Sequence, residues 1–215
     1  MQTISQKTLE DTMYYRNIPV FIYKINYPFF TTTCSTSAAQ SINEHYVSAS
    51  KEKEVYCRTV LYPQAVKSAR YIPSNQPPFN SYTFESNYQI TYNTNCITSL
   101  YMEQYTYMGG AHGATQRNSD TWDFNTGNQL KLESFYPHNP AFSEDILKEI
   151  EQQIAGRLKT SPSSYFNNYS ELLRETFRQE NFYLSPMGIV IYFQEYDIAP
   201  YATGIPEFLL QFQNS

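Results

Sequence analysis

The chain has 215 residues and a formal net charge of -5, with 41% hydrophobic and 17% aromatic residues. This length suffices to bury one sizeable core, and the mildly acidic balance without a basic stripe argues against a nucleic-acid-binding protein. The 21 Tyr and 14 Phe residues favour β-sheets over helix bundles, because aromatic side chains fit a pleated, half-buried surface.

The N-terminal part of the chain shows a polar segment, then a strand pattern, then a helix pattern. Residues 1–17 predict an arm or a short edge element, and residues 18–27 alternate in the manner of a strand. Ser35 or Ser37 is a candidate N-cap for a helix that begins at Ala38.

The next segments predict a break, a connection and a β-hairpin. Pro63 is expected to kink or break the helix, and the three prolines within 73–79 predict an irregular connection. Residues 82–92 give the clearest strand pattern of the chain, with one apolar and one polar face. A turn at 93–96 then leads to a partner strand at 97–107.

The segment 105–113, YTYMGGAHG, is the most distinctive stretch of the sequence. Gly109, Gly110 and Gly113 lie within five residues, which predicts a forced reversal or a wide bulge. The segment is either a structural corner, in which His112 caps backbone groups, or a ligand-contacting loop. The sequence leaves both interpretations open.

The chain continues with a second short hairpin and an amphipathic helix. The hairpin joins 121–125 to 130–132, and Asn139 with Pro140 is a good helix start, since Asn caps and Pro suits the first helical position. The apolar stripe of this helix contains Ile146, Leu147, Ile150, Ile154 and Leu158. These elements predict a helix that packs on a sheet.

The C-terminal part predicts a short helix and further strands. The helix is expected at 169–178, and a strand begins at 182–184. The apolar run 189–198 is expected to be a central strand, and 208–212 an edge or return strand.

An ungapped comparison of residues 100–113 with residues 191–204 indicates a possible internal repeat. The fold class predicted from all these elements is α+β, with antiparallel sheet, two main helices on one face and, as a hypothesis, two β-α-β-β units. The expected organisation is an N-terminal arm (1–17), a first half (18–113) and a second half (114–215) that together form one compact unit. The aligned identities are Tyr101 with Tyr192, Tyr105 with Tyr196, Ala111 with Ala202, and Gly113 with Gly204.

No recognised catalytic or metal-binding motif occurs in the sequence. The three histidines, at 45, 112 and 138, have no metal-ligand spacing with another His or Cys, so no metal and no cofactor is expected. The cysteines at 34, 57 and 96 are odd in number and lack a C-x-x-C spacing, and we interpret them as unpaired structural thiols. A glycan hydrolase that uses Glu103 with Glu195, or His112, is the enzymatic alternative.

Three segments together carry a resemblance to a known family: YTYMGGAHG, TWDFNTGNQLKLESFY and FYLSPMGIVIYFQEYDIAPYATGIPEFLL. From Ile18 to Phe212, the chain resembles the domain family of the extracytoplasmic lysozyme-binding region of the anti-sigma-V factor RsiV. The same family occurs N-terminal to a peptidoglycan deacetylase. The resemblance implies an α+β fold and a binding rather than a catalytic role, although the sigma-binding segment, the transmembrane helix and the deacetylase domain of these relatives have no counterpart in this sequence.

From the residues and the resemblance we predict a non-catalytic binding module. Its partner would be a cationic protein such as lysozyme, which suits an acidic receptor, or a cell-wall glycan. The absence of a signal-peptide pattern favours the cytoplasm, whereas the resemblance favours an extracytoplasmic location. The predicted contact residues form a glycine-rich and tyrosine-rich rim of Tyr107, Gly109, Gly110, His112, Gly113, Tyr196, Tyr201 and Gly204.

Overall fold

A computed structural model of the chain describes residues 1–71 and 79–212. The chain forms two compact units, which are considered separately below. The N-terminal unit contains Gln2–Tyr88 and Met102–Thr115, and the C-terminal unit contains Met1, Gln89–Tyr101 and the chain from Gln116 onward. The predicted connection at 73–79 falls, as far as residue 78, outside the described residues.

The strands belong to two sheets. The six-stranded sheet has the order β1-β2-β3-β4-β5-β6 and the three-stranded sheet the order β7-β8-β9. The predicted α+β class, dominated by antiparallel pairing, is confirmed. The strands are β1 (Thr3–Tyr15), β2 (Ile18–Thr31), β3 (Tyr82–Thr94), β4 (Ile97–Tyr107), β5 (Ala114–Asp123), β6 (Asn128–Gln129), β7 (Phe182–Ser185), β8 (Gly188–Tyr192) and β9 (Glu207–Gln211).

In the N-terminal unit, β1 and β2 form a long antiparallel hairpin. Arg16 and Asn17 turn the chain with φ angles of 49° and 65°, the left-handed values that a two-residue hairpin turn requires. The segment predicted as an arm or edge element is therefore an edge strand of 13 residues. After the hairpin, β3 pairs with β2 in parallel, which requires the crossover that the helices supply.

This crossover contains α1 (Thr36–Tyr56), the π-helical turn η1 (Cys57–Leu61) and α2 (Tyr62–Ala69). Ser35 is the N-cap of α1, since its Oγ accepts a hydrogen bond from the Ala38 backbone N–H at 3.3 Å. The α-helix is interrupted at η1, shortly before Pro63, and α2 follows as a second helical piece of the kind expected after this proline. Pro63 stands in the first turn of α2, where the backbone N–H that proline lacks would need no partner in the same helix.

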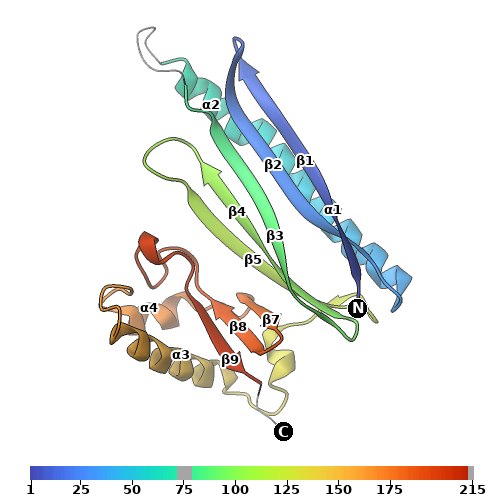
Figure 1. Ribbon diagram of the computed structural model, residues 1–215, viewed down its shortest axis with the longest axis vertical. Helices are drawn as coiled ribbons and strands as arrows, with labels where there is room; N and C mark the ends of the chain where they lie inside the picture. The colour runs from blue at the N-terminus through green and yellow to red at the C-terminus, as the bar shows by residue number, and fades with distance from the viewer. Residues whose placement is uncertain (72–78, 213–215) are drawn as a thin grey trace. The chain divides into compact units, whose positions relative to one another are not determined.

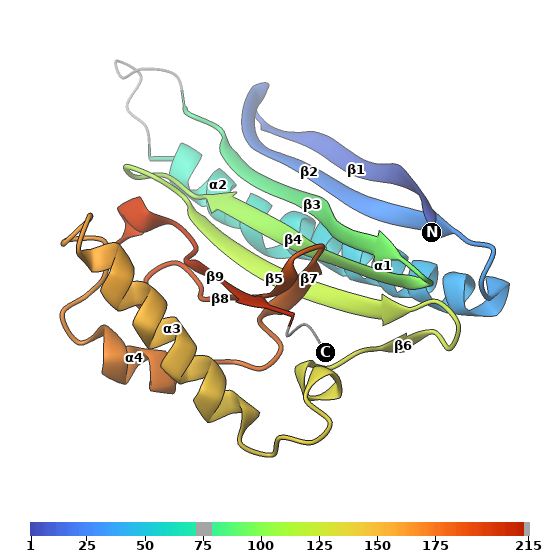
Figure 2. The same ribbon diagram turned by 60° about the horizontal axis from the view of Figure 1, so that its bottom comes forward.

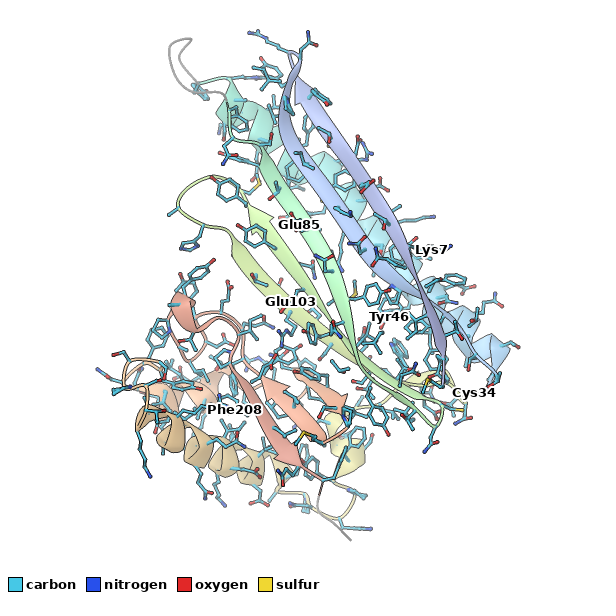
Figure 3. All side chains as sticks on the ribbon, viewed as in Figure 1. Lys7, Cys34, Tyr46, Glu85, Glu103 and Phe208 are labelled. Atoms are coloured by element: carbon cyan, nitrogen blue, oxygen red, sulfur yellow. The ribbon has the colours of Figure 1, made fainter. Side chains whose placement is uncertain are left out.

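The helices α1 and α2 lie along one face of β2, as Figures 1 and 2 show. Figure 3 places Tyr46 of α1 between the helix and the sheet, and its ring contacts that of Phe30 at 5.9 Å. Beside it, buried Asn43 satisfies both backbone groups of Phe30, at 2.8 Å to the N–H and 2.9 Å to the carbonyl. Bulky aromatic residues and one amide therefore join helix to sheet in this unit.

In the C-terminal unit, α3 (Phe142–Leu158) and α4 (Tyr169–Thr176) share one hydrophobic core with the sheet β7-β8-β9. The predicted start with Asn139 as N-cap is wrong, because α3 begins at Phe142 and its N-cap is Ala141, with no side-chain cap. Asn139 instead accepts a hydrogen bond from the Ala141 N–H at 3.0 Å, in the turn that precedes the helix. The predicted central strand at 189–198 is the middle strand β8, but it ends already at Tyr192. Phe208 of β9 belongs to the core of this unit (Figure 3).

The cysteine interpretation is wrong for two of the three residues. Cys34 and Cys96 are disulfide-bonded, and Cys57 is a free, buried thiol. Burial raises the pKa of the Cys57 thiol to about 12, with the negative charge of Glu54 as a second cause. An odd number of cysteines excludes complete pairing but not a single bridge, and sequence spacing does not report which thiols meet in space.

Candidate functional site

The segment 105–113 forms a compact loop at the end of β4. Gly109 and Gly110 both have left-handed backbones, with φ angles of 91° and 92°, which favour glycine. A Cβ atom at Gly109 would lie 2.8 Å from the hydroxyl oxygen of Tyr82. The sequence prediction of a forced reversal at these glycines is thus confirmed within the N-terminal unit.

Gly113 closes the same loop for a different reason. A Cβ atom there would lie 2.5 Å from the backbone oxygen of Thr106 and 2.6 Å from the ring of Tyr105. The Gly113 N–H donates to the Tyr105 hydroxyl at 3.2 Å, and Nδ1 of His112 donates to the Gly113 carbonyl at 2.8 Å. Only a residue without a side chain fits this close approach.

Tyr107 also serves the loop that follows it. Its hydroxyl donates to the Gly110 carbonyl at 3.2 Å and accepts from the Asn80 amide at 3.3 Å. Its ring meets that of Tyr82 edge-on, with ring centroids 6.1 Å apart. These contacts agree with the structural-corner interpretation of the segment, because its tyrosines bind the loop's own backbone.

The other predicted contact residues, Tyr196, Tyr201 and Gly204, lie in the segment that follows β8 in the C-terminal unit. Tyr196 is 53% exposed, and its ring stacks on that of Tyr201 with centroids 5.9 Å apart and planes inclined by 27°. Its φ angle of 68° is unusual for a residue with a side chain. Tyr201 begins the short helix η3 (Tyr201–Thr203), and Gly204 follows with a φ of 70° and open space around its Cα.

The backbone under this tyrosine pair is tied down by polar contacts. The Gln194 side chain accepts from the Arg117 N–H at 2.9 Å and donates to the Arg117 carbonyl at 2.7 Å, so the amide acts as an added strand residue. Asp197 accepts from the Gln194 N–H at 2.8 Å. Burial raises the pKa of the Asp197 carboxyl, and this hydrogen bond together with Arg178 opposes the rise.

A buried cluster around Arg117 was missed by the sequence reasoning. The guanidinium of Arg117 lies 4.0 Å from the centroid of the Tyr101 ring and 5.4 Å from that of Tyr192. It also forms an ion pair with Glu207. The Arg117 side chain is only 7% exposed, so the pair and the two rings supply what a buried cation needs.

Two tyrosines near Arg117 have hydroxyl groups whose pKa is strongly raised. Burial raises the pKa of Tyr192 to about 12, while hydrogen bonding from Ser119 and the charge of Arg117 lower it. Burial, followed by the charge of Glu207, raises the pKa of Tyr183 even further. The available signal in the sequence was the alignment of Tyr101 with Tyr192, but it did not reveal that both rings flank one arginine.

The residues of the enzymatic alternative do not lie in one unit. Glu103 and His112 belong to the N-terminal unit and Glu195 to the C-terminal unit. The His112 Nδ1 is engaged with a carbonyl of its own loop. Within residues 1–71 and 79–212, no three His, Cys, Asp or Glu side chains gather so that they could hold a metal ion. None of these observations specifically favours the hydrolase.

In comparisons with known proteins, two family models match consecutive parts of the chain and together span most of it. Residues 16–115 match the family described as "Deacetylase PdaC", and residues 134–213 match the family described as "Protein of unknown function (DUF3298)". Both matches are consistent with the RsiV-like domain family, and the family resemblance predicted from the sequence is confirmed. The function of the DUF3298 family, which residues 134–213 match, is unknown. Among curated proteins, none matches the chain.

Solved structures of two DUF3298 proteins share the fold. One, from Bacteroides fragilis, has a TM-score of 0.69 and 19% identity, and the match covers 98% of this chain and 90% of the other. Another, from Pseudomonas aeruginosa, has a TM-score of 0.64 and 15% identity, with coverage of 97% and 91%. In the part of the chain that the structure describes, no helix is both long and apolar enough to cross a membrane.

Proposed function

We propose that this protein is a non-catalytic binding module, and that the stack of the exposed Tyr196 on the half-buried Tyr201 is the centre of its contact surface. The observation that supports this proposal is the placement of two aromatic rings at the surface on a backbone held in an unfavourable conformation. Such strain persists only where the surroundings fix it, and it is common at binding sites. The contacts of Gln194 and Asp197 supply that fixation.

The preferred partner is a cationic protein such as a C-type lysozyme. Tyrosine offers a large contact area at a low cost in side-chain entropy and is enriched among the residues that dominate binding energy. The net charge of -5 favours the approach of a basic partner. A cell-wall glycan, which could also stack on the two rings, is the other ligand that the test below distinguishes.

The test is calorimetric titration of C-type lysozyme into the purified chain at two salt concentrations. We expect binding that weakens as salt rises, because charge attraction is screened, and that is roughly 30-fold weaker in Tyr201→Ala. Tyr56→Ala is the matched control, since Tyr56 is a 47% exposed tyrosine on α1. No binding of lysozyme, with binding of soluble peptidoglycan fragments instead, would replace the protein partner by a glycan. Binding of neither would overturn the proposal.

We further propose that the module works in an oxidising compartment outside the cytoplasm. The disulfide-bonded state of Cys34 and Cys96 supports this location, because cytosolic thiols are kept reduced. We therefore prefer the extracytoplasmic alternative, which the resemblance also favoured, to the cytoplasmic location suggested by the missing signal-peptide pattern.

Thiol counting on protein purified from its native location, with free thiols blocked at lysis, tests the compartment. The denatured but unreduced protein should expose one thiol, that of Cys57, and reduction should raise the number to three. Three reactive thiols before reduction would contradict the proposal. The folded protein should react slowly, because Cys57 is buried.

A further inference from the structure

A pocket of about 430 Å³ lies in the C-terminal unit, apart from the tyrosine stack. Its lining combines apolar side chains from β8, β9 and α3, including Ile146, Ile189 and Leu210, with polar groups from the segment that precedes α3. A concave site that combines apolar and aromatic side chains with convergent polar groups is suited to a small molecule. No residue assigned to the proposed contact surface lines it.

The wall of the pocket is aromatic. Tyr136 stacks on Phe142 with ring centroids 5.2 Å apart and planes inclined by 13°, which fixes the ring. Its hydroxyl has no hydrogen-bond partner within the described part of the chain, so it is available to a ligand. Phe212, which is 47% exposed, contributes a second ring. An aromatic face attracts a cation through its quadrupole.

The rim of the pocket carries negative charge. Asp145 and Glu149 stand one turn apart on α3, so both carboxylates face the same side. Asp145 already receives the Asn139 amide at 2.9 Å and the Lys148 ammonium at 3.5 Å. Glu149, by contrast, has a single long hydrogen bond, from Gln153 at 3.5 Å. Its charge is one cause of the raised pKa of Tyr136, after burial, which places the carboxylate near the aromatic wall.

We propose that this pocket binds a small organic cation, with the ammonium group at Glu149 and the apolar body against Tyr136 and Phe212. The apolar side chains of the lining favour a ligand with an apolar body, and the carboxylates disfavour an anion. An amine with an aromatic or aliphatic body satisfies both the rim and the wall. This inference does not depend on the Tyr196–Tyr201 surface.

Titration of the ¹⁵N-labelled full chain with benzylammonium, followed by NMR, tests the proposal. We expect saturable shifts at the amides of Tyr136, Glu149 and Phe212. Neutral benzyl alcohol should bind several-fold more weakly and benzoate not at all. A parallel titration with n-butylammonium separates two sources of the same chemistry, since tighter binding of this compound would indicate a lysine side chain and tighter binding of benzylammonium a free aryl amine.

Variants locate the site. Glu149→Gln should lower the affinity for benzylammonium about two- to fivefold, which is the range of an exposed charge pair. Tyr136→Leu should lower this affinity further, although it leaves the charge of Glu149 in place. Glu171→Gln, an exposed carboxylate on α4 outside the pocket, is the matched control and should change nothing. Equal affinity for benzyl alcohol, an unchanged affinity in Glu149→Gln, or no saturable shift would each overturn the proposal.

Discussion

The two segments that align in the sequence, 105–113 and 196–204, differ in where their aromatic side chains go. In the first, Tyr105 and Tyr107 use their hydroxyls to bind the loop's own backbone, and Gly113 leaves no room for a side chain. In the second, Tyr196 and Tyr201 stack on each other at the surface, and the space around Gly204 is open. Similar residues thus build a closed corner in one unit and a stacked pair with one exposed ring in the other.

The largest expected effect in this comparison is that of Gly113→Ala. The new methyl group would meet backbone at 2.5 Å, and we expect the free energy of unfolding to fall by about 3 kcal/mol, as for severe overpacking. Denaturant unfolding measures the change. Gly156→Ala, with open space on α3, should instead raise stability by about 0.5 kcal/mol, since alanine is the better helix former. Equal effects of the two changes on the free energy of unfolding would show that the loop can move enough to accept a methyl group at Gly113.

The second prediction separates structure from binding. Tyr201→Ala should cost about 2 kcal/mol of lysozyme binding, roughly 30-fold, as an aromatic residue that dominates an interface does, with little change in melting temperature. Tyr107→Ala should lower the melting temperature and leave affinity nearly intact, because its hydroxyl and ring serve its own loop. For both variants, calorimetry measures the affinity for lysozyme and thermal unfolding measures the melting temperature. If Tyr107→Ala abolishes binding in a folded protein, the first loop also contacts the partner.

Gly204→Ala should have a smaller effect than Gly113→Ala. No atom lies within 4 Å of the added methyl group, so only the left-handed backbone at φ 70° opposes it. We expect a loss of about 1 kcal/mol in the free energy of unfolding. A loss as large as that of Gly113→Ala would mean that the second segment is packed as tightly as the first.

The smallest expected effect is a pH dependence at Asp197. Its pKa is raised by burial, so the protonated form favours the folded state. Its contribution is fully present below the ordinary aspartate pKa of about 3.9 and is lost as pH rises through the higher folded value. The difference in melting temperature between Asp197→Asn and the unaltered protein should therefore grow in favour of the variant as pH rises from about 3.5 to 6. A difference that stays constant with pH would remove Asp197 as a titrating group.

Local patterns were reliable where a single element decided the outcome. The alternation at 82–92 and the glycine-rich reversal at 109–110 predicted the β3 strand and the turn after β4, because a strand period and a left-handed backbone are properties of adjacent residues. The N-cap at Ser35 followed for the same reason. The second helical piece expected after Pro63 is α2, but the π-helical form of the interruption at Cys57–Leu61 was not predicted, because it lies before the proline and no residue pattern marks it.

The sequence by itself determined the α+β class, the family and the segments that carry unusual residues. Only the tertiary structure decided that Cys34 and Cys96 are disulfide-bonded and that Arg117 is buried between Tyr101 and Tyr192. It also decided that Tyr105 and Tyr107 are hydrogen-bonded to their own loop, whereas Tyr196 is exposed and stacks on Tyr201. The physical reason is that hydrophobic periodicity and turn propensity act over a few residues, whereas the burial of a charge, the meeting of two thiols and the exposure of a ring depend on groups distant in the chain.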